Sequence, residues 1–174
     1  MPLRPLPAWS GAVAAAQELL RQQASAEPFA GLPSALAPHE VMQAYATQDA
    51  LVAAQMQQRS TGTRGYKIAI TTPVMREFVG FDDAISGCVL ADTVFPSGHT
   101  VPWAQHQHLI IEFELALQLG RDLPARDTPW TAESVLAFID GAYPALEIAD
   151  DRHAVYADLK QHFFSLVAEN AWNH

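Results

Sequence analysis

Cysteine is almost absent from this sequence: Cys88 is the only one, so no disulfide can form within the chain. Such a composition is typical of proteins from a reducing compartment, and we expect a cytoplasmic location. We interpret Cys88 as a small buried residue, with a catalytic thiol as the alternative. No apolar run approaches the roughly 20 residues of a membrane-spanning helix, so we expect no membrane partner.

Basic residues are also scarce. The chain has 10 Lys and Arg against 19 Asp and Glu, which gives a formal net charge of −9. We therefore expect no nucleic-acid partner, because binding to a phosphate backbone requires a basic surface. A protein of this charge that handles an anionic substrate needs a local positive centre, such as a metal ion or a buried lysine.

Several common catalytic motifs are missing. The sequence has no GxSxG segment, no P-loop and no HExxH segment. The glycines at 62 and 65 are too close together for a dinucleotide-binding turn. His106 and His108 are two residues apart and would share one face of a strand, but this spacing alone is weak evidence for a metal site.

The apolar fraction of 49% over 174 residues is enough for a single domain with a substantial core. Helical patterns come first and strand patterns dominate afterwards, which indicates an α+β fold. We divide the domain into an N-terminal helical segment, 1–60, and a β-rich region, 61–174. Helices are expected at about 11–24, 39–59, 74–79, 131–140 and 155–168, and strands at about 66–71, 87–90, 100–101, 109–119 and 145–148.

Carboxylates interrupt two apolar, strand-like segments, IEFE at 111–114 and PALE at 144–147. Residues two apart in a strand share a face, so Glu112 and Glu114 would point the same way. If Glu147 joined them, the three carboxylates would need a cation, and oxygen ligands favour Mg²⁺ or Mn²⁺. On spacing alone, a half-exposed strand with glutamates on its wet side is the stronger interpretation. The opposite face, which we expect to point into a core, carries Ile111, Phe113, Leu115 and Leu117.

Lys67 stands near the start of an apolar strand, directly after a glycine and a tyrosine. The ordinary interpretation is a solvated lysine, and spacing alone favours it. The functional alternative is a partly desolvated amine near a metal ion. Both surroundings lower the pKa of a lysine, which suits it to proton transfer.

Five segments resemble, in the same order, the family of 2-keto-4-pentenoate hydratases and 4-oxalocrotonate decarboxylases in the fumarylacetoacetase-like superfamily. The segments are AYATQDAL at 44–51, GYKIAITTP at 65–73, IEFELA at 111–116 with GRDLP at 120–124, YPALEI at 143–148 and AENA at 168–171. The resemblance implies N-terminal helices followed by a mixed β-sheet or barrel of the fumarylacetoacetase-like type. It also implies that this barrel is incomplete at the C-terminus.

The resemblance further implies roles for individual residues. Carried over position by position, Glu112, Glu114 and Glu147 correspond to the metal-binding carboxylates, which makes 61–174 a metal-binding region for Mg²⁺ or Mn²⁺. Lys67 corresponds to the catalytic lysine, which also contacts the substrate, and Thr72 is a second expected substrate contact. The resemblance thus reverses the preference that spacing alone gives for solvated glutamates.

The implied activity is that of a divalent-metal-dependent lyase. The main expectation is hydration of a small anionic 2-hydroxy-2,4-dienoate of the 2-keto-4-pentenoate type to a 4-hydroxy-2-oxo acid, in the catabolism of aromatic compounds. The first alternative is decarboxylation of a 2-oxo acid of the 4-oxalocrotonate type, because both reactions need negative charge stabilised on the same oxygen. We expect a homo-oligomer or a complex with a homologous enzyme.

Two other classes of function stay open. A truncated, non-catalytic subunit that acts in oligomerisation would be favoured by exposed apolar side chains along 109–119. A hydrolase of carbon–carbon bonds would need a histidine that activates water, and His39 is the only candidate near a suitable helix.

Overall fold

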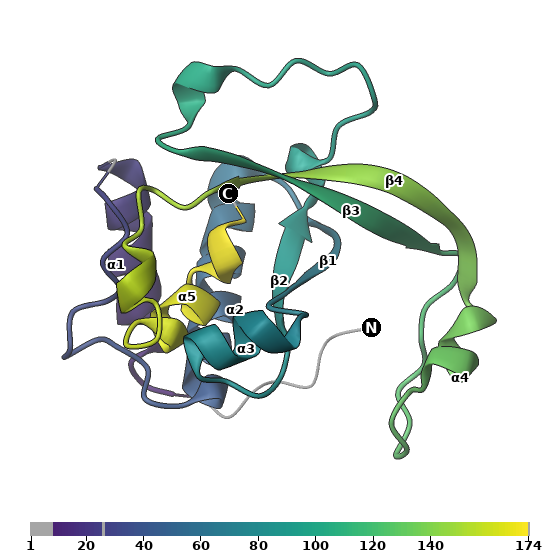
Figure 1. The fold of residues 1–174 in the computed structure, drawn as a ribbon, viewed down its shortest axis with the longest axis horizontal. Coiled ribbons are helices and arrows are strands. Elements are labelled where there is room, and N and C mark those ends of the chain that lie inside the picture. Colours follow the sequence, from purple (N-terminus) through teal and green to yellow (C-terminus); the bar gives the residue numbers. More distant parts are fainter. Residues whose placement is uncertain (1–8, 26, 174) are drawn as a thin grey trace. The chain divides into compact units, whose positions relative to one another are not determined.

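The structure, a computed structural model, describes residues 9–25 and 27–173 (Figure 1). Its contacts divide the chain into two compact units, which we call the ribbon unit, 110–148, and the helical unit, 9–109 with 149–173. The helices and strands are α1 (Ala12–Ala24), α2 (Val41–Arg59), β1 (Thr63–Ala69), α3 (Pro73–Val79), β2 (Ile85–Leu90), β3 (Leu109–Leu119), α4 (Ala132–Leu136), β4 (Ile139–Asp150) and α5 (Phe163–Ala168).

The core of the helical unit is formed mainly by α1, α2 and α5. Leu19 of α1, Leu51 of α2 and Val167 of α5 are fully buried in one apolar cluster. Alanines surround them, including Ala15 and Ala44, and their small side chains let the helices approach closely. None of the helices in the described ranges is both long and apolar enough to cross a lipid bilayer.

Strands β1 and β2 form an antiparallel pair in which Lys67 lies opposite Gly87. Along β1 the side chains alternate, so the exposed Tyr66 and Ile68 point to one face of the pair. Lys67 therefore points to the other face and is half-buried there.

Side chains form hydrogen bonds with the backbone groups on the second edge of β2, the edge that faces away from β1. The backbone N–H of Ser86 donates to the Tyr45 hydroxyl at 2.9 Å, and the Ser86 carbonyl accepts from Gln48 Nε2 at 3.0 Å. Two residues along, the Cys88 N–H donates to Asn170 Oδ1 at 2.6 Å, and the Cys88 carbonyl accepts from Asn170 Nδ2 at 2.9 Å. These bonds stand in for a third strand, because buried backbone groups need partners.

The ribbon unit contains the pair of β3 and β4 and the short helix α4 between them in sequence (Figure 1). The prediction that one face of β3 points into a core is wrong: Ile111, Phe113, Leu115 and Leu117 are all exposed, Phe113 to 91% and Leu115 to 65%. The reason is that the ribbon unit is a two-stranded sheet with no second layer of its own, so alternation cannot bury either face.

Most predicted elements are present with different ends, and one predicted strand is absent from the described residues. The strand expected at 109–119 matches β3, whereas residues 100–101 form no strand. β4 is longer than expected and α4 shorter, because residues 139 and 140 pair as strand instead of extending the helix. Of the helix expected at 155–168, only its last part is α5. The expected boundary at residue 60 separates α1 and α2 from all four strands, and it lies inside the helical unit.

An ion pair between Arg152 and Glu169 lies inside the helical unit, with the two side chains 2% and 0% exposed. Arg152 also donates to the Glu27 carbonyl at 3.0 Å. Burial raises the pKa of Glu169 to about 7, since removal from water disfavours the carboxylate more than Arg152 stabilises it.

This raised pKa predicts a pH-dependent contribution to stability. Between the ordinary value of 4.5 and about 7 the folded chain holds a proton on Glu169 that the unfolded chain releases. The free energy of unfolding should therefore fall as pH rises through this window, by on the order of 1–3 kcal/mol from this group. Urea unfolding of Glu169→Gln, which stays neutral, should show a flatter pH dependence than the wild type between pH 5 and 8. Glu77→Gln, at an exposed position, is the matched control, and a wild-type slope in Glu169→Gln would contradict the assignment.

Candidate metal centre

Three glutamates converge on the ribbon unit. Glu112 and Glu114 come from β3, where a spacing of two residues puts them on the same face. Glu147 comes from the paired strand β4. One carboxylate oxygen from each of the three lies within 4.8 Å of the others. The structure thus brings together the three carboxylates that the sequence singles out, and their role as metal ligands stays a prediction.

The donor set suits a hard divalent cation. The side chains of Glu112 and Glu114 are exposed and that of Glu147 is half-buried, so water weakens their mutual repulsion to about 1 kcal/mol per pair. Around Mg²⁺ at about 2.1 Å, neighbouring oxygens are about 3 Å apart and opposite ones about 4 Å. Small side-chain rotations would close the observed spacing to those values. The three residues therefore fit Mg²⁺ or Mn²⁺ in number, chemistry and position.

Lys67 belongs to the helical unit, where its amine contacts the main chain. Its Nζ donates a hydrogen bond of 2.6 Å to the carbonyl oxygen of Ala171, and Ala171 is buried. Lys67 is thus not the fully solvated lysine of the ordinary interpretation. A half-buried amine with a fixed direction is what proton transfer requires, and the catalytic role stays a prediction.

Thr72, also in the helical unit, has a structural role at the start of α3. Its hydroxyl oxygen accepts a hydrogen bond from the Met75 N–H at 3.3 Å, as the N-cap of the helix. The preceding Ile70 has a φ of 51°, in the left-handed region that β-branched residues rarely adopt. Such strain often marks functional segments, and a substrate contact by Thr72 stays a prediction.

Within 9–25 and 27–173, the histidines do not form a metal site with one another. His108 Nδ1 lies 2.7 Å from Asp151 Oδ1, and the Tyr156 hydroxyl donates to Asp151 Oδ2 at 3.0 Å. Among the residues that the structure describes, the three glutamates are the only group of three or more His, Cys, Asp and Glu side chains close enough to share a metal ion. His39 lies exposed just before α2, where nothing points to the activation of water. The His108–Asp151 pair has no local sequence signal, because its members are far apart in the chain.

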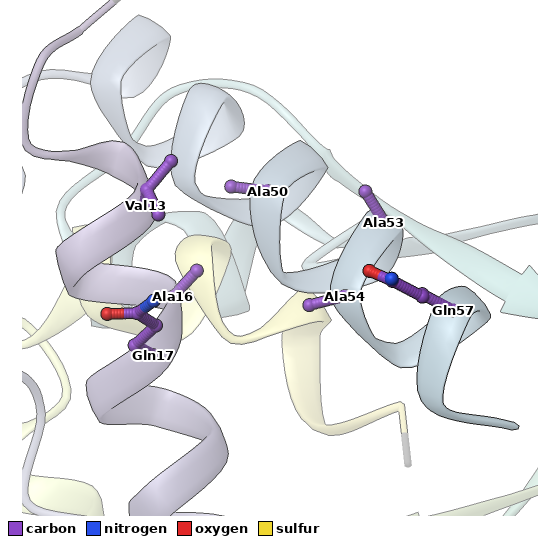
Figure 2. Close-up of a pocket in the computed structure, with 7 residues that line it drawn as sticks. All are labelled: Val13, Ala16, Gln17, Ala50, Ala53, Ala54 and Gln57. Carbon is purple, nitrogen blue, oxygen red and sulfur yellow. The ribbon is translucent and has the colours of Figure 1, made fainter.

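A groove between α1 and α2 has a volume of about 310 Å³. Figure 2 shows that small and amide side chains line it, and none of them can ionise or act as a nucleophile. The groove therefore offers no group for catalysis. Its lining residues are Val13, Ala16, Gln17, Ala50, Ala53, Ala54 and Gln57.

Comparison with curated proteins finds two enzyme classes. The chain is 34% identical over 159 residues to a 2-keto-4-pentenoate hydratase of Paraburkholderia xenovorans (strain LB400), and the match covers 90% of the chain and 56% of the hydratase. It is 30% identical over 121 residues to a 4-oxalocrotonate decarboxylase of a Pseudomonas species, covering 70% of the chain and 45% of the decarboxylase. The chain thus spans about half the length of these relatives. None of the family models compared with the sequence matches it.

Comparison with solved structures finds the same fold. Two structures of 4-oxalocrotonate decarboxylase from Pseudomonas putida G7, complexed with calcium and acetate and with magnesium and adipate, match with TM-scores of 0.78 and 0.80. Each match covers 98% of this chain and 62% of the decarboxylase, at 19% sequence identity. The resemblance that the five sequence segments predict is therefore confirmed, and the matching fold agrees with the predicted α+β class.

Proposed function

We propose that this chain, a relative of 2-keto-4-pentenoate hydratases and 4-oxalocrotonate decarboxylases, acts as a divalent-metal-dependent lyase. The main reaction is addition of water to a 2-hydroxy-2,4-dienoate to give a 4-hydroxy-2-oxo acid. The observation that carries the proposal is the convergence of three glutamates from β3 and β4 within 4.8 Å. We also propose that strands β1 to β4 correspond to part of a barrel of the fumarylacetoacetase-like type.

The similar decarboxylase structures support the choice of ligand. They hold magnesium or calcium together with a carboxylic acid, adipate or acetate. In this chain Glu112, Glu114 and Glu147 would bind Mg²⁺ or Mn²⁺ through their carboxylate oxygens. The bound cation would supply stabilisation of the negative charge that develops on the 2-oxygen of the substrate.

Lys67 would move the proton that the reaction requires. Its ammonium has three N–H donors, one of which is used by the Ala171 carbonyl, so the direction of the group is restricted. An amine held in this way can donate a proton to substrate and recover it without searching many rotamers. Thr72 would add a hydroxyl contact to the substrate, beside its role at the start of α3.

Hydration and decarboxylation need the same charge stabilisation, so the proposed residues do not separate them. We favour hydration because the sequence match to the hydratase is longer, 159 residues against 121 for the decarboxylase. The match to the decarboxylase structures, at 19% identity, concerns the fold alone.

A second candidate function is a non-catalytic subunit that associates with other copies of this chain. The observation that favours it is the exposed apolar face of β3, which includes Phe113 and Leu115. A row of such side chains on a two-stranded sheet is typical of a surface that another chain covers.

Metal binding is tested by the double variant Glu112→Gln and Glu114→Gln. Neutral amides cannot balance a dication, so the Kd for Mn²⁺ should rise by about 100-fold or more in isothermal titration calorimetry. The control is Glu133→Gln, an exposed glutamate in the first turn of α4, which should bind like the wild type. Unchanged affinity in the double variant would count against the site.

Catalysis is tested by Lys67→Ala, with the loss of dienol absorbance of 2-hydroxypenta-2,4-dienoate in the presence of Mg²⁺ as the measurement. Turnover should fall by about 10²–10⁴-fold, since a general acid–base contributes that much. Lys160→Ala, at the other lysine of the chain, should keep wild-type turnover. A loss under about threefold in Lys67→Ala would give Lys67 a structural role. A wild-type chain without metal-dependent turnover would contradict the lyase proposal.

Self-association is tested by Phe113→Ser in analytical ultracentrifugation. If copies pair through β3, loss of this side chain should weaken association by about tenfold or more, since burial of a phenylalanine stabilises an interface by about 1.5–3 kcal/mol. Leu136→Ser, at an exposed leucine of α4, is the matched control. A wild-type chain that sediments as a monomer at all concentrations would remove the second candidate.

A further inference from the structure

The amine of Lys67 has a defined partner far away in the sequence. Lys67 Nζ donates to the carbonyl oxygen of Ala171 at 2.6 Å, and Ala171 lies in the turn Asn170–Trp172 that follows α5. The position of the amine therefore depends on the position of this turn. Whatever holds the turn therefore constrains where the lysine can place a proton.

The turn is attached to β2 by the side-chain amide of Asn170. Its Oδ1 accepts from the Cys88 N–H at 2.6 Å, and its Nδ2 donates to the Cys88 carbonyl at 2.9 Å. Asn173 also donates to the Cys88 carbonyl through its own amide. The two bonds of Asn170 form a bracket that copies the pairing of a neighbouring strand. Because Asn170 is only 1% exposed, water does not compete for these bonds.

The backbone of the turn has three successive residues in a conformation that non-glycine residues rarely adopt. Asn170, Ala171 and Trp172 have φ values of 62°, 50° and 60°, in the left-handed region. Asparagine tolerates this region, but alanine and tryptophan do not favour it. Three such residues in succession persist only where surrounding contacts hold them, and the Asn170 bracket is one of these contacts, beside the packing of Trp172 against Phe29.

Gly87 permits the close approach of the turn to β2. A Cβ at this position would lie 2.9 Å from the backbone oxygen of Asn170, 3.1 Å from its Oδ1 and 3.3 Å from Cγ of Lys67. A methyl group there would push against both the turn and the bracket without removing any hydrogen-bonding group. Gly65, on β1, has nothing within 4 Å of its own Cβ position and offers a matched comparison.

We propose that Asn170 is a positioning residue for Lys67. Its amide bracket on Cys88 fixes the turn, and the turn aims the Ala171 carbonyl at the lysine amine. The functional significance of this inference rests on the proposed catalytic role of Lys67. The hydrogen bonds that position the amine do not depend on which reaction is catalysed.

The experiment uses the ammonium signal of lysine in nuclear magnetic resonance. The chain has two lysines, Lys67 and the exposed Lys160, so ¹⁵N-lysine labelling gives at most two ammonium signals. An exposed ammonium exchanges protons with water too quickly to be seen near neutral pH, whereas a half-buried, hydrogen-bonded one exchanges slowly. The wild type should show one signal, which Lys67→Arg removes and Lys160→Arg retains.

Asn170→Ala should release the amine. We expect its ammonium protons to exchange with water at least about tenfold faster, so that the signal broadens or disappears. Gly87→Ala should have the same effect through displacement of the turn, and Gly65→Ala should keep the wild-type signal. If the lyase proposal holds, Asn170→Ala should also lower kcat by about tenfold with little change in KM. Because the spectra need neither metal nor substrate, a failure of the lyase proposal leaves this test intact.

Three results would overturn the proposal. The first is a wild type without a scalar coupling across the hydrogen bond between Lys67 Nζ and the Ala171 carbonyl carbon. The second is a folded Asn170→Ala or Gly87→Ala chain whose ammonium signal exchanges at the wild-type rate. The third is loss of the whole fold in both variants, judged by circular dichroism, which would make the bracket a requirement of folding and not of lysine position.

Discussion

The helical unit depends on hydrogen-bond partners for the backbone groups on the edge of β2 that does not pair with β1. A sheet of two strands leaves backbone donors and acceptors without strand partners, and buried groups of this kind are costly to leave unsatisfied. Here side chains from α2 and from the turn after α5 take the place of a third strand. Gln48 shows how far one residue reaches, because its Nε2 donates both to the Ser86 carbonyl at 3.0 Å and to the Val167 carbonyl at 2.8 Å. Two helices, α2 and α5, and the strand β2 are thereby joined by one buried amide.

The groups proposed for chemistry are divided between the two units. The ribbon unit carries the three glutamates, and the pairing of β3 with β4 brings them together. The helical unit carries Lys67 and Thr72, and the same polar contacts that complete β2 also fix the surroundings of Lys67. In the helical unit, Lys67 and the groups that complete β2 are thus neighbours in one hydrogen-bond network.

Sequence reasoning succeeds where the signal is local and fails where it depends on packing. Alternation predicts the bounds of β3 and the shared face of Glu112 and Glu114, because both follow from the geometry of a single strand. It singles out Glu147 in a second strand-like segment but cannot predict that Glu147 lies beside them, which only the resemblance to known enzymes implied. The buried face expected for β3 is wrong, since burial is decided by a second layer. The bracket of Asn170 was missed because an amide that bonds a distant strand leaves no periodic pattern.

The ribbon of β3 and β4 has two faces with different contents, carboxylates on one and apolar side chains such as Phe113 on the other. Strand geometry couples these faces, because a shift of pairing by a single residue exchanges inward and outward positions along the whole strand. A slipped ribbon would scatter the glutamates and place charged groups among leucines. A change of register that suits one face of the ribbon therefore also alters the opposite face. Short insertions or deletions in either strand should be among the least tolerated changes in this chain.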